Sequence, residues 1–270
     1  MFAAPGAALV AALIASPATA YGADAPGQDK PGHYGFAVIG DVPYGAAQLA
    51  AFPAMVDRIN AEPGIDLAFH VGDIKNGSSP CTDEYNAIIK AQFDRFDTPL
   101  AMATLHIVGS NNGLAPWTGL TTPQPGQLAD EQARTDAAIA LVEETFDGAR
   151  QRNDRAVVLF QQADMFDPTI APKPSNTSAF TRLVQTIVDE SSTFDGEVYL
   201  IDGDSHRYHV DQPVAAGSPW LDYYGIVSAA DNLTRITVDG EQQNVDFLKV
   251  TVNRPGAERV LSWERIPYDS

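Results

Sequence analysis

Two short apolar runs, each ending in a glycine and an aspartate, constrain the fold of this chain more than any other feature. The first ends at Gly40-Asp41 and the second at Gly72-Asp73. Between them, apolar residues recur with a helical period from Ala46 to Asn60, and Pro63-Gly64 ends the helix. A strand–helix–strand unit of this length pairs its strands in parallel through a right-handed crossover. Both aspartates are therefore expected at the same edge of a parallel sheet, where ligand sites collect.

The rest of the chain extends this unit. Strands are expected at residues 34–39, 65–71, 100–108, 156–161 and 198–201, and helices at 46–60, 82–96, 130–146 and 176–190. After residue 207 the helical period disappears, and antiparallel strands are expected at 223–230, 233–238, 245–252 and 260–265. Strand–helix alternation followed by strands alone predicts an α/β domain with a mixed sheet or two packed sheets.

Length and charge narrow the class of protein. The 270 residues suffice for one large α/β domain, and we expect residues 34–270 to form it. The formal net charge of −18 argues against a nucleic-acid partner, because proteins that bind the phosphate backbone usually present a basic face.

The N-terminus has the pattern of a signal peptide. Residues 7–15 are apolar, and Ala18 and Ala20 stand where a signal peptidase would cleave, before Tyr21. We therefore expect residues 1–20 to be removed on export, residues 21–33 to form a linker, and the protein to be secreted or held in the cell envelope. The apolar run is too short to span a membrane in the mature chain. No Lys or Arg precedes it, so a disordered apolar leader or a misassigned start codon is the alternative.

Polar side chains follow each expected strand at the point where it ends. In chain order they are Asp41, Asp73, Asn111 or Asn112, Gln161 or Gln162, Asp204, His206 and His209. Each alone is an ordinary turn or surface residue, but their succession at strand ends favours a shared site. Mixed oxygen and nitrogen ligands suit Mn, Fe or Zn better than Ca. Two such metals sharing one aspartate would hold a phosphate ester and activate water.

The order of these motifs resembles the calcineurin-like metallophosphoesterase superfamily over about residues 34–265. It is closest to a bacterial, often exported branch with Gly-Asp-x-Pro-Tyr, His-x-Gly-Asp-Ile-Lys-x-Gly, Gly-Asp-Asn-Glu-Trp and Gly-Asp-Ser-His motifs. The corresponding segments here are Gly40–Tyr44, His70–Gly77, Gly109–Gly113 and Gly203–His206. The resemblance implies a four-layer α/β/β/α sandwich of two packed mixed sheets flanked by helices.

The resemblance also implies roles for individual residues. Asp73 would bridge two divalent metal ions (Mn, Fe or Zn), or bind the single ion if only one is present. Asp41 and His206 would complete the first metal site. The second would take Asn111, with Gln162 and Asp204 as further candidates. Asp73, Asn111 and His206 would form the catalytic group, and Tyr44 and Lys75 lie in loops that could touch a phosphate.

The sequence departs from the superfamily pattern in ways that bear on activity. Pro43 replaces a histidine ligand and Asp204 replaces the first histidine of the last motif, as in the branch. Ser110 and Asn112 replace two acids of the third motif, and the catalytic histidine that usually follows the ligand asparagine is absent. Fewer carboxylates mean weaker cation binding, and the group that protonates the leaving group is not identified.

Two functions follow from this pattern. The first is an exported, metal-dependent hydrolase of phosphomonoesters or phosphodiesters, with a phosphoester substrate as its partner. The alternative is a catalytically impaired protein of the same fold that acts as a binding or cell-envelope module. Substrate specificity would reside in the segments 114–126 and 168–174, whose chemistry the sequence does not reveal.

Overall fold

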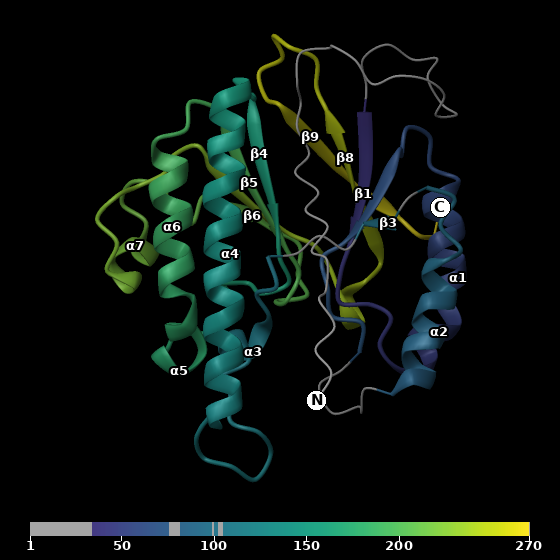
Figure 1. Cartoon of the computed structure of the whole chain (residues 1–270). Helices are drawn as coiled ribbons and strands as arrows, with labels where there is room; N and C mark the ends of the chain where they lie inside the picture. The colour runs from purple at the N-terminus through teal and green to yellow at the C-terminus, as the bar shows by residue number, and fades with distance from the viewer. Residues whose placement is uncertain (1–33, 76–81, 99, 102–104, 270) are drawn as a thin grey trace.

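The computed structural model describes residues 34–75, 82–98, 100–101 and 105–269. The expected signal peptide and linker lie outside the described residues. Two β-sheets pack face to face, and each is covered on its outer face by helices (Figure 1). This arrangement confirms the predicted α/β sandwich of two packed mixed sheets flanked by helices.

The first sheet has five strands in the order β3-β2-β1-β8-β9. Strand β1 (Tyr34–Ile39) runs parallel to β2 (Leu67–His70), which runs parallel to β3 (Leu100–Ala101). On its other side β1 pairs antiparallel with β8 (Asp246–Val252), and β8 pairs antiparallel with β9 (Leu261–Pro267). The parallel β1–α1–β2 unit predicted from the two glycine–aspartate motifs is therefore present.

The second sheet has four strands in the order β4-β5-β7-β6. Strands β4 (Ala156–Phe160), β5 (Glu197–Asp202) and β7 (Leu233–Thr237) are mutually parallel. The short β6 (His209–Asp211) pairs antiparallel with β7 at the sheet edge. The carboxyl ends of β4, β5 and β7 thus lie at one edge of this sheet.

Helices cover the two outer faces. Helices α1 (Gly45–Asn60) and α2 (Asp83–Phe93) cover the first sheet, and α4 (Pro125–Arg152) and α6 (Thr181–Ser192) cover the second (Figure 1). The shorter helices are α3 (Gly109–Asn112), α5 (Pro174–Thr177) and α7 (Pro219–Tyr224), with 3₁₀ turns η1 (Ser178–Phe180) and η2 (Glu241–Gln243).

Alternating side chains connect these layers. In β1, Phe36 and Val38 enter the apolar cluster between the sheets, whereas Ala37 and Ile39 face α1. The side-chain period of two in a strand produces this division and buries both faces. A third cluster joins the second sheet to α4 and α6. The three clusters are the three interfaces of a four-layer structure.

The structure corrects several predicted elements. The expected strand 223–230 is wrong: Ser218 caps α7, Pro219 begins it, and Gly225 ends it at φ 70°. The apolar and aromatic residues of α7 pack in the cluster that joins the second sheet to α4 and α6. A buried apolar run of this kind resembles a strand in the sequence. The expected antiparallel strand 233–238 is β7, which pairs antiparallel with β6 but parallel with β5.

Other differences concern the lengths of elements. β3 covers only Leu100–Ala101, and residues 105–108 are not a strand. α4 begins at Pro125, five residues before the predicted start at Asp130, because Gln124 and Gln127 form a capping box around Pro125. The predicted helix 176–190 is divided into α5, η1 and α6. Within the described part of the chain, no helix combines the length and apolar character needed to cross a membrane.

Candidate metal centre

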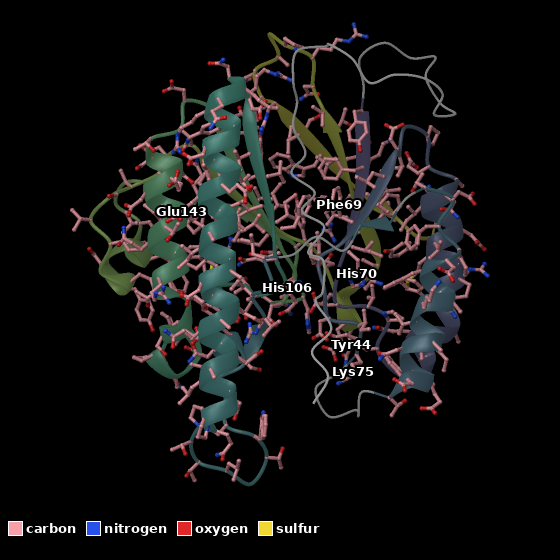
Figure 2. All side chains as sticks on the ribbon, viewed as in Figure 1. Tyr44, Phe69, His70, Lys75, His106 and Glu143 are labelled. Carbon is pink, nitrogen blue, oxygen red and sulfur yellow. The ribbon has the colours of Figure 1, made fainter. Side chains whose placement is uncertain are left out.

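The loops that follow the parallel strands of both sheets meet in one place. The backbone N–H of Asp41, after β1, donates to the carbonyl of Gly72, after β2, at 2.9 Å. The N–H of Glu241, after β7, donates to the carbonyl of Asp41 at 2.9 Å. The N–H groups of Gly203 and Asp204 both donate to the carbonyl of Gln162. Loops from the two sheets are therefore joined directly, and Figure 2 shows Tyr44, His70 and Lys75 at this end of the first sheet.

Asp41 is the most buried acid of this group, with no exposed surface. Its Oδ1 accepts hydrogen bonds from Gln162 Nε2 at 3.1 Å, His206 Nε2 at 3.2 Å and the Tyr44 hydroxyl at 3.3 Å. Its Oδ2 is buried and has no hydrogen-bond partner. Burial raises the pKa of Asp41, and the hydrogen bonds from His206 and Gln162 oppose that increase. A buried carboxylate oxygen without a partner is costly unless a ligand supplies one.

Tyr44 connects Asp41 to Asp73. Its hydroxyl donates to Asp41 Oδ1 at 3.3 Å, and the negative charge of Asp73 also acts on the phenol. Burial, and then the two negative charges, raise the pKa of Tyr44, so that the phenol stays protonated at neutral pH. Asp73 itself is exposed to solvent. The two aspartates that the sequence placed at one sheet edge are therefore brought together, with a phenol between them.

His206 is held from both sides by carboxylates. Its Nε2–H donates to Asp41 and its Nδ1–H donates to Glu241 Oε2 at 3.1 Å. The hydrogen bond to Asp41 is the main cause that raises the pKa of His206 to about 9. A carboxylate on Nδ1 is the usual partner of a histidine that binds metal through Nε2. We call Asp41, Tyr44, Asp73, His206 and Glu241 the carboxylate–imidazole cluster.

The backbone around this cluster is held in a rarely used conformation. Asp41, Asp73, His206 and Glu241 have φ values of 53°, 55°, 57° and 47°. A non-glycine residue at positive φ costs about 1–3 kcal/mol, and such residues gather at functional sites. Glycine is required alongside: a Cβ on Gly203 would lie 2.2 Å from Asp41 Oδ2, and one on Gly240 would lie 2.6 Å from Asp41 Cβ. The backbone therefore packs directly against the Asp41 side chain.

The Gln162 side chain directs its NH₂ group, and not its amide oxygen, toward the neighbouring carboxylates. Its Nε2 donates to Asp41 Oδ1 and to Asp204 Oδ1, the latter at 2.7 Å. Its Oε1 accepts from the Gly109 N–H at 2.7 Å. An amide binds a cation through oxygen, so the predicted ligand here places its NH₂ between two carboxylates. Burial raises the pKa of Asp204 to about 7.

Asn111 is likewise occupied by protein groups. Its Nδ2 donates to Ser178 Oγ at 3.1 Å, and its Oδ1 accepts from the Ala179 N–H at 2.9 Å. Its alternative, Asn112, is fully buried and is bonded to Arg134 and Thr135 of α4. Both polar atoms of the Asn111 side chain are thus bonded to the turn η1, and the predicted role of Asn111 as a metal ligand stays a prediction. We call Asn111, Asn112 and Gln162 the amide cluster.

Two further sequence candidates lie outside the contacts described above. Gln161, the alternative to Gln162, turns its Nε2 to the carbonyl of Ala163 at 2.6 Å. His209, on β6, contacts Asp211 at 3.3 Å. Neither side chain contacts Asp41, His206 or Asp204 in the described part of the chain.

His70 has a structural role that the sequence did not reveal. Its ring is fully buried; Nε2–H donates to the carbonyl of Val42 at 2.8 Å, and Nδ1 accepts from the Gly72 N–H at 3.1 Å. These partners require the neutral ring, and burial lowers the pKa of His70 to about 4. His70 thus fixes the loops that carry Asp41 and Asp73 to one another.

Glu241 is the residue of the cluster that sequence reasoning missed. The dipeptide Gly240-Glu241 follows the β7 segment, just as Gly40-Asp41 follows β1 and Gly72-Asp73 follows β2. With Gly203-Asp204 after β5, Gly240-Glu241 is the fourth glycine–acid pair that follows a strand, and it was visible in the sequence. The expected antiparallel pairing of residues 233–238 concealed it, because only a parallel β7 ends at the same edge as β5.

The groups around Asp41 and the amide cluster differ in how far the protein satisfies their polar atoms. Asp41 has an unpartnered buried oxygen, and the Glu241–His206 pair leaves Nε2 facing Asp41. In the residues that the structure describes, no three acidic, histidine or cysteine side chains converge as a ready cation site. The Tyr44 hydroxyl and His206 Nε2 both donate hydrogen bonds to Asp41 Oδ1. Asp41, Asp73 and His206 thus supply carboxylate and imidazole groups but do not form such a site in this conformation. The polar atoms of Asn111 and Gln162 are bonded to protein groups.

Comparisons with known proteins give limited similarity. No protein-family model matches the chain, and no curated protein matches it. Among solved structures, the chain is similar to GAP50, the anchor in the inner membrane complex of Plasmodium. The TM-score is 0.45 at 10% sequence identity, covering 89% of this chain and 90% of that one.

Proposed function

We propose that this protein is a metal-dependent phosphoester hydrolase that uses one divalent cation (Mn, Fe or Zn) held by Asp41, Asp73 and His206. The observation that carries the proposal is the environment of Asp41. Its Oδ2 is buried without a partner, while its Oδ1 contacts an imidazole that Glu241 orients. The resemblance of the motifs to calcineurin-like metallophosphoesterases supports a phosphoester as the substrate.

Each residue of the carboxylate–imidazole cluster has a role in this proposal. When bound, a divalent cation polarises a phosphoryl oxygen and makes water a stronger nucleophile at neutral pH. Asp41 and Asp73 supply the negative charge that holds it, and Glu241 fixes the orientation of His206. Tyr44 keeps its proton and donates it in a hydrogen bond to Asp41, so the phenol would hold this carboxylate in place.

Hydrolysis of an aryl phosphate in the presence of Mn²⁺ tests the proposal. We expect the Asp73→Asn variant to lose at least about a hundredfold in kcat/KM, because a ligand is lost while the shape is kept. The matched control is Asp97→Asn, an exposed aspartate remote from the cluster, which should retain wild-type rates. Equal rates for wild type and Asp73→Asn would contradict the proposal.

The amide cluster favours a second candidate, a binding module without turnover. The NH₂ of Gln162 lies between Asp41 and Asp204, and the amide of Asn111 is bonded to Ser178 and Ala179. Such a protein would hold one metal ion and a phosphate-bearing ligand without cleaving it. Elemental analysis together with the aryl phosphate assay separates the two: bound metal with no hydrolysis of monoesters or diesters supports the binding module.

A further inference from the structure

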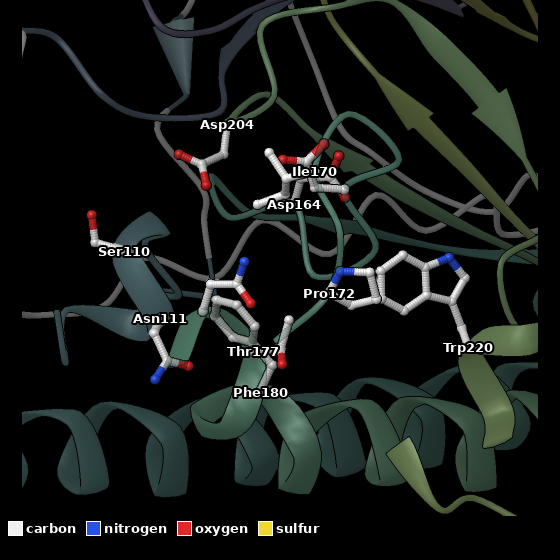
Figure 3. A pocket seen from close by; sticks show the side chains of 11 residues that line it. Ser110, Asn111, Asp164, Ile170, Pro172, Thr177, Phe180, Asp204 and Trp220 are labelled. Carbon is white, nitrogen blue, oxygen red and sulfur yellow. The ribbon is translucent and has the colours of Figure 1, made fainter. Parts of the chain in front are cut away.

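A cavity of about 170 Å³ adjoins the candidate metal centre on the side of the second sheet (Figure 3). Asp204, whose Oδ1 accepts from Gln162, lines the cavity at the end nearest the cluster. Trp220 of α7 and residues of the segment 164–180, which includes the proline-rich stretch, line the rest of the cavity. A group bound here would therefore lie next to a substrate held at Asp41 and Asp73.

The lining of this cavity is acidic. It contains the carboxyl groups of Asp164, Asp167 and Asp204, and among the described residues that line it there is no Lys, Arg or His. Asp164 is 6% exposed, and its Oδ2 is buried with no hydrogen-bond partner. The nearest buried cation, Arg235, is shared between Asp164 and Asp211. The cavity therefore carries an acidic side chain that lacks a partner on one oxygen, and it disfavours an anion.

The remaining wall is apolar and aromatic. Trp220, Ile170, Pro172 and Phe180 line it together with the methyl-bearing Thr177. Figure 3 shows the Trp220 indole at the far side of the cavity from Ser110. Carboxylates combined with an indole face and aliphatic surface are the environment that proteins use to bind organic ammonium groups.

We propose that this cavity is a subsite for a small organic ammonium group. This inference rests on the proposed function: the cavity receives the alcohol portion of the phosphoester. The substrate class is therefore a phosphorylated amino alcohol. The cavity volume is large enough for such a group, because a cavity of roughly 150 Å³ holds a benzene molecule. A quaternary ammonium headgroup with its two-carbon chain is comparably small.

Direct binding tests the subsite without reference to catalysis. Calorimetric titration of the full chain compares the affinity for choline with the affinity for 3,3-dimethylbutanol. The two alcohols have the same shape and differ only in the positive charge. We expect choline to bind at least tenfold more tightly. Asp167→Asn, which keeps the acceptor that Thr169 uses, and Trp220→Leu should each weaken choline binding at least fivefold. The exposed controls Asp97→Asn and Trp117→Leu should leave it unchanged. Equal binding of the two alcohols, or none, would overturn the subsite.

Hydrolysis then separates the failure of the subsite from that of the proposed function. With Mn²⁺, we expect choline phosphate to exceed 3,3-dimethylbutyl phosphate in kcat/KM at least tenfold, and Asp167→Asn to reduce this ratio. Hydrolysis of both esters at equal rates would retain the phosphoesterase and overturn the ammonium subsite. Hydrolysis of neither ester, with choline binding that Asp167→Asn weakens, would retain the ammonium subsite and overturn the hydrolase.

Discussion

The carboxylate–imidazole cluster and the amide cluster lie side by side but are organised in opposite ways. In the first, Asp41 keeps an unpartnered buried oxygen, and His206 is oriented by a second carboxylate. In the second, the amide groups of Asn111 and Gln162 bond both their oxygen and their nitrogen to protein groups. The comparison shows that residues of metal-ligand type differ in how far the surrounding chain satisfies their polar atoms. We therefore expect one cation at this site.

Replacing Asp41 should have the largest effect. Asp41→Asn keeps the shape but removes the charge that a cation needs, so metal affinity should fall by more than about a hundredfold, beyond the loss expected for an outer residue. Titration with Mn²⁺ measures this change. The variant Asp154→Asn, at a buried acid paired with Arg152 far from the cluster, tests whether any buried acid has the same effect. Unchanged Mn²⁺ affinity in Asp41→Asn would show that the carboxylate–imidazole cluster does not hold the metal ion.

Acidification should destabilise the loops of the carboxylate–imidazole cluster through His70. The folded pKa of about 4 lies below the ordinary value of 6.5, so the unfolded state binds the proton more readily. Stability from the neutral ring is therefore complete above pH 6.5 and is lost as the pH falls towards 4, by up to about 3 kcal/mol.

Urea unfolding at pH 7.5 and pH 4.5 measures this loss. In His70→Gln, the part of the difference between the two pH values that belongs to His70 should disappear. An identical pH difference in wild type and variant would show that His70 does not titrate as its burial predicts.

Glu241→Gln sharpens the comparison at an outer position. The amide keeps a hydrogen-bond acceptor for His206 but removes the charge, so metal affinity should fall by about 10–100-fold. Glu258→Gln, an exposed acid near the C-terminal hairpin, is the control and should bind metal normally. An affinity loss as large as that of Asp41→Asn would instead place Glu241 among the direct ligands.

Gly203→Ala tests the close packing of backbone against Asp41. The new Cβ would lie 2.2 Å from Asp41 Oδ2 and 3.0 Å from Val71 Cγ2, so the carboxylate must move. We expect a loss of about 1–3 kcal/mol in the free energy of unfolding. Gly126→Ala, at an open position in the first turn of α4, should be neutral or slightly stabilising in the same urea measurement.

Asn111→Gly should have the smallest effect on metal binding. Glycine accepts the φ of 57° at this position, so only the hydrogen bonds to Ser178 and Ala179 are lost. Stability should fall by about 1 kcal/mol, while Mn²⁺ affinity stays within about threefold of wild type. A loss of metal in this variant would mean that Asn111 changes its partners to bind a second cation.

The sequence predicted the layers better than it predicted the amide cluster. The apolar run of β1 and the helical period of α1 are local patterns, and they predicted the β1–α1–β2 unit and its two aspartates. The orientation of the Gln162 amide depends on Gly109, Asp41 and Asp204, which come from three separate loops. No local pattern encodes such a contact. Glu241 was missed for a similar reason, because the direction of β7 is set by its pairing with β5.

The stoichiometry of metal binding tests the central claim most directly. Calorimetric titration of the wild-type chain with Mn²⁺, after removal of bound metal by chelation and dialysis, counts the sites. The account predicts one equivalent that disappears in Asp41→Asn and persists in Asn111→Gly. Two equivalents, or one that Asn111→Gly removes while Asp41→Asn does not, would contradict it.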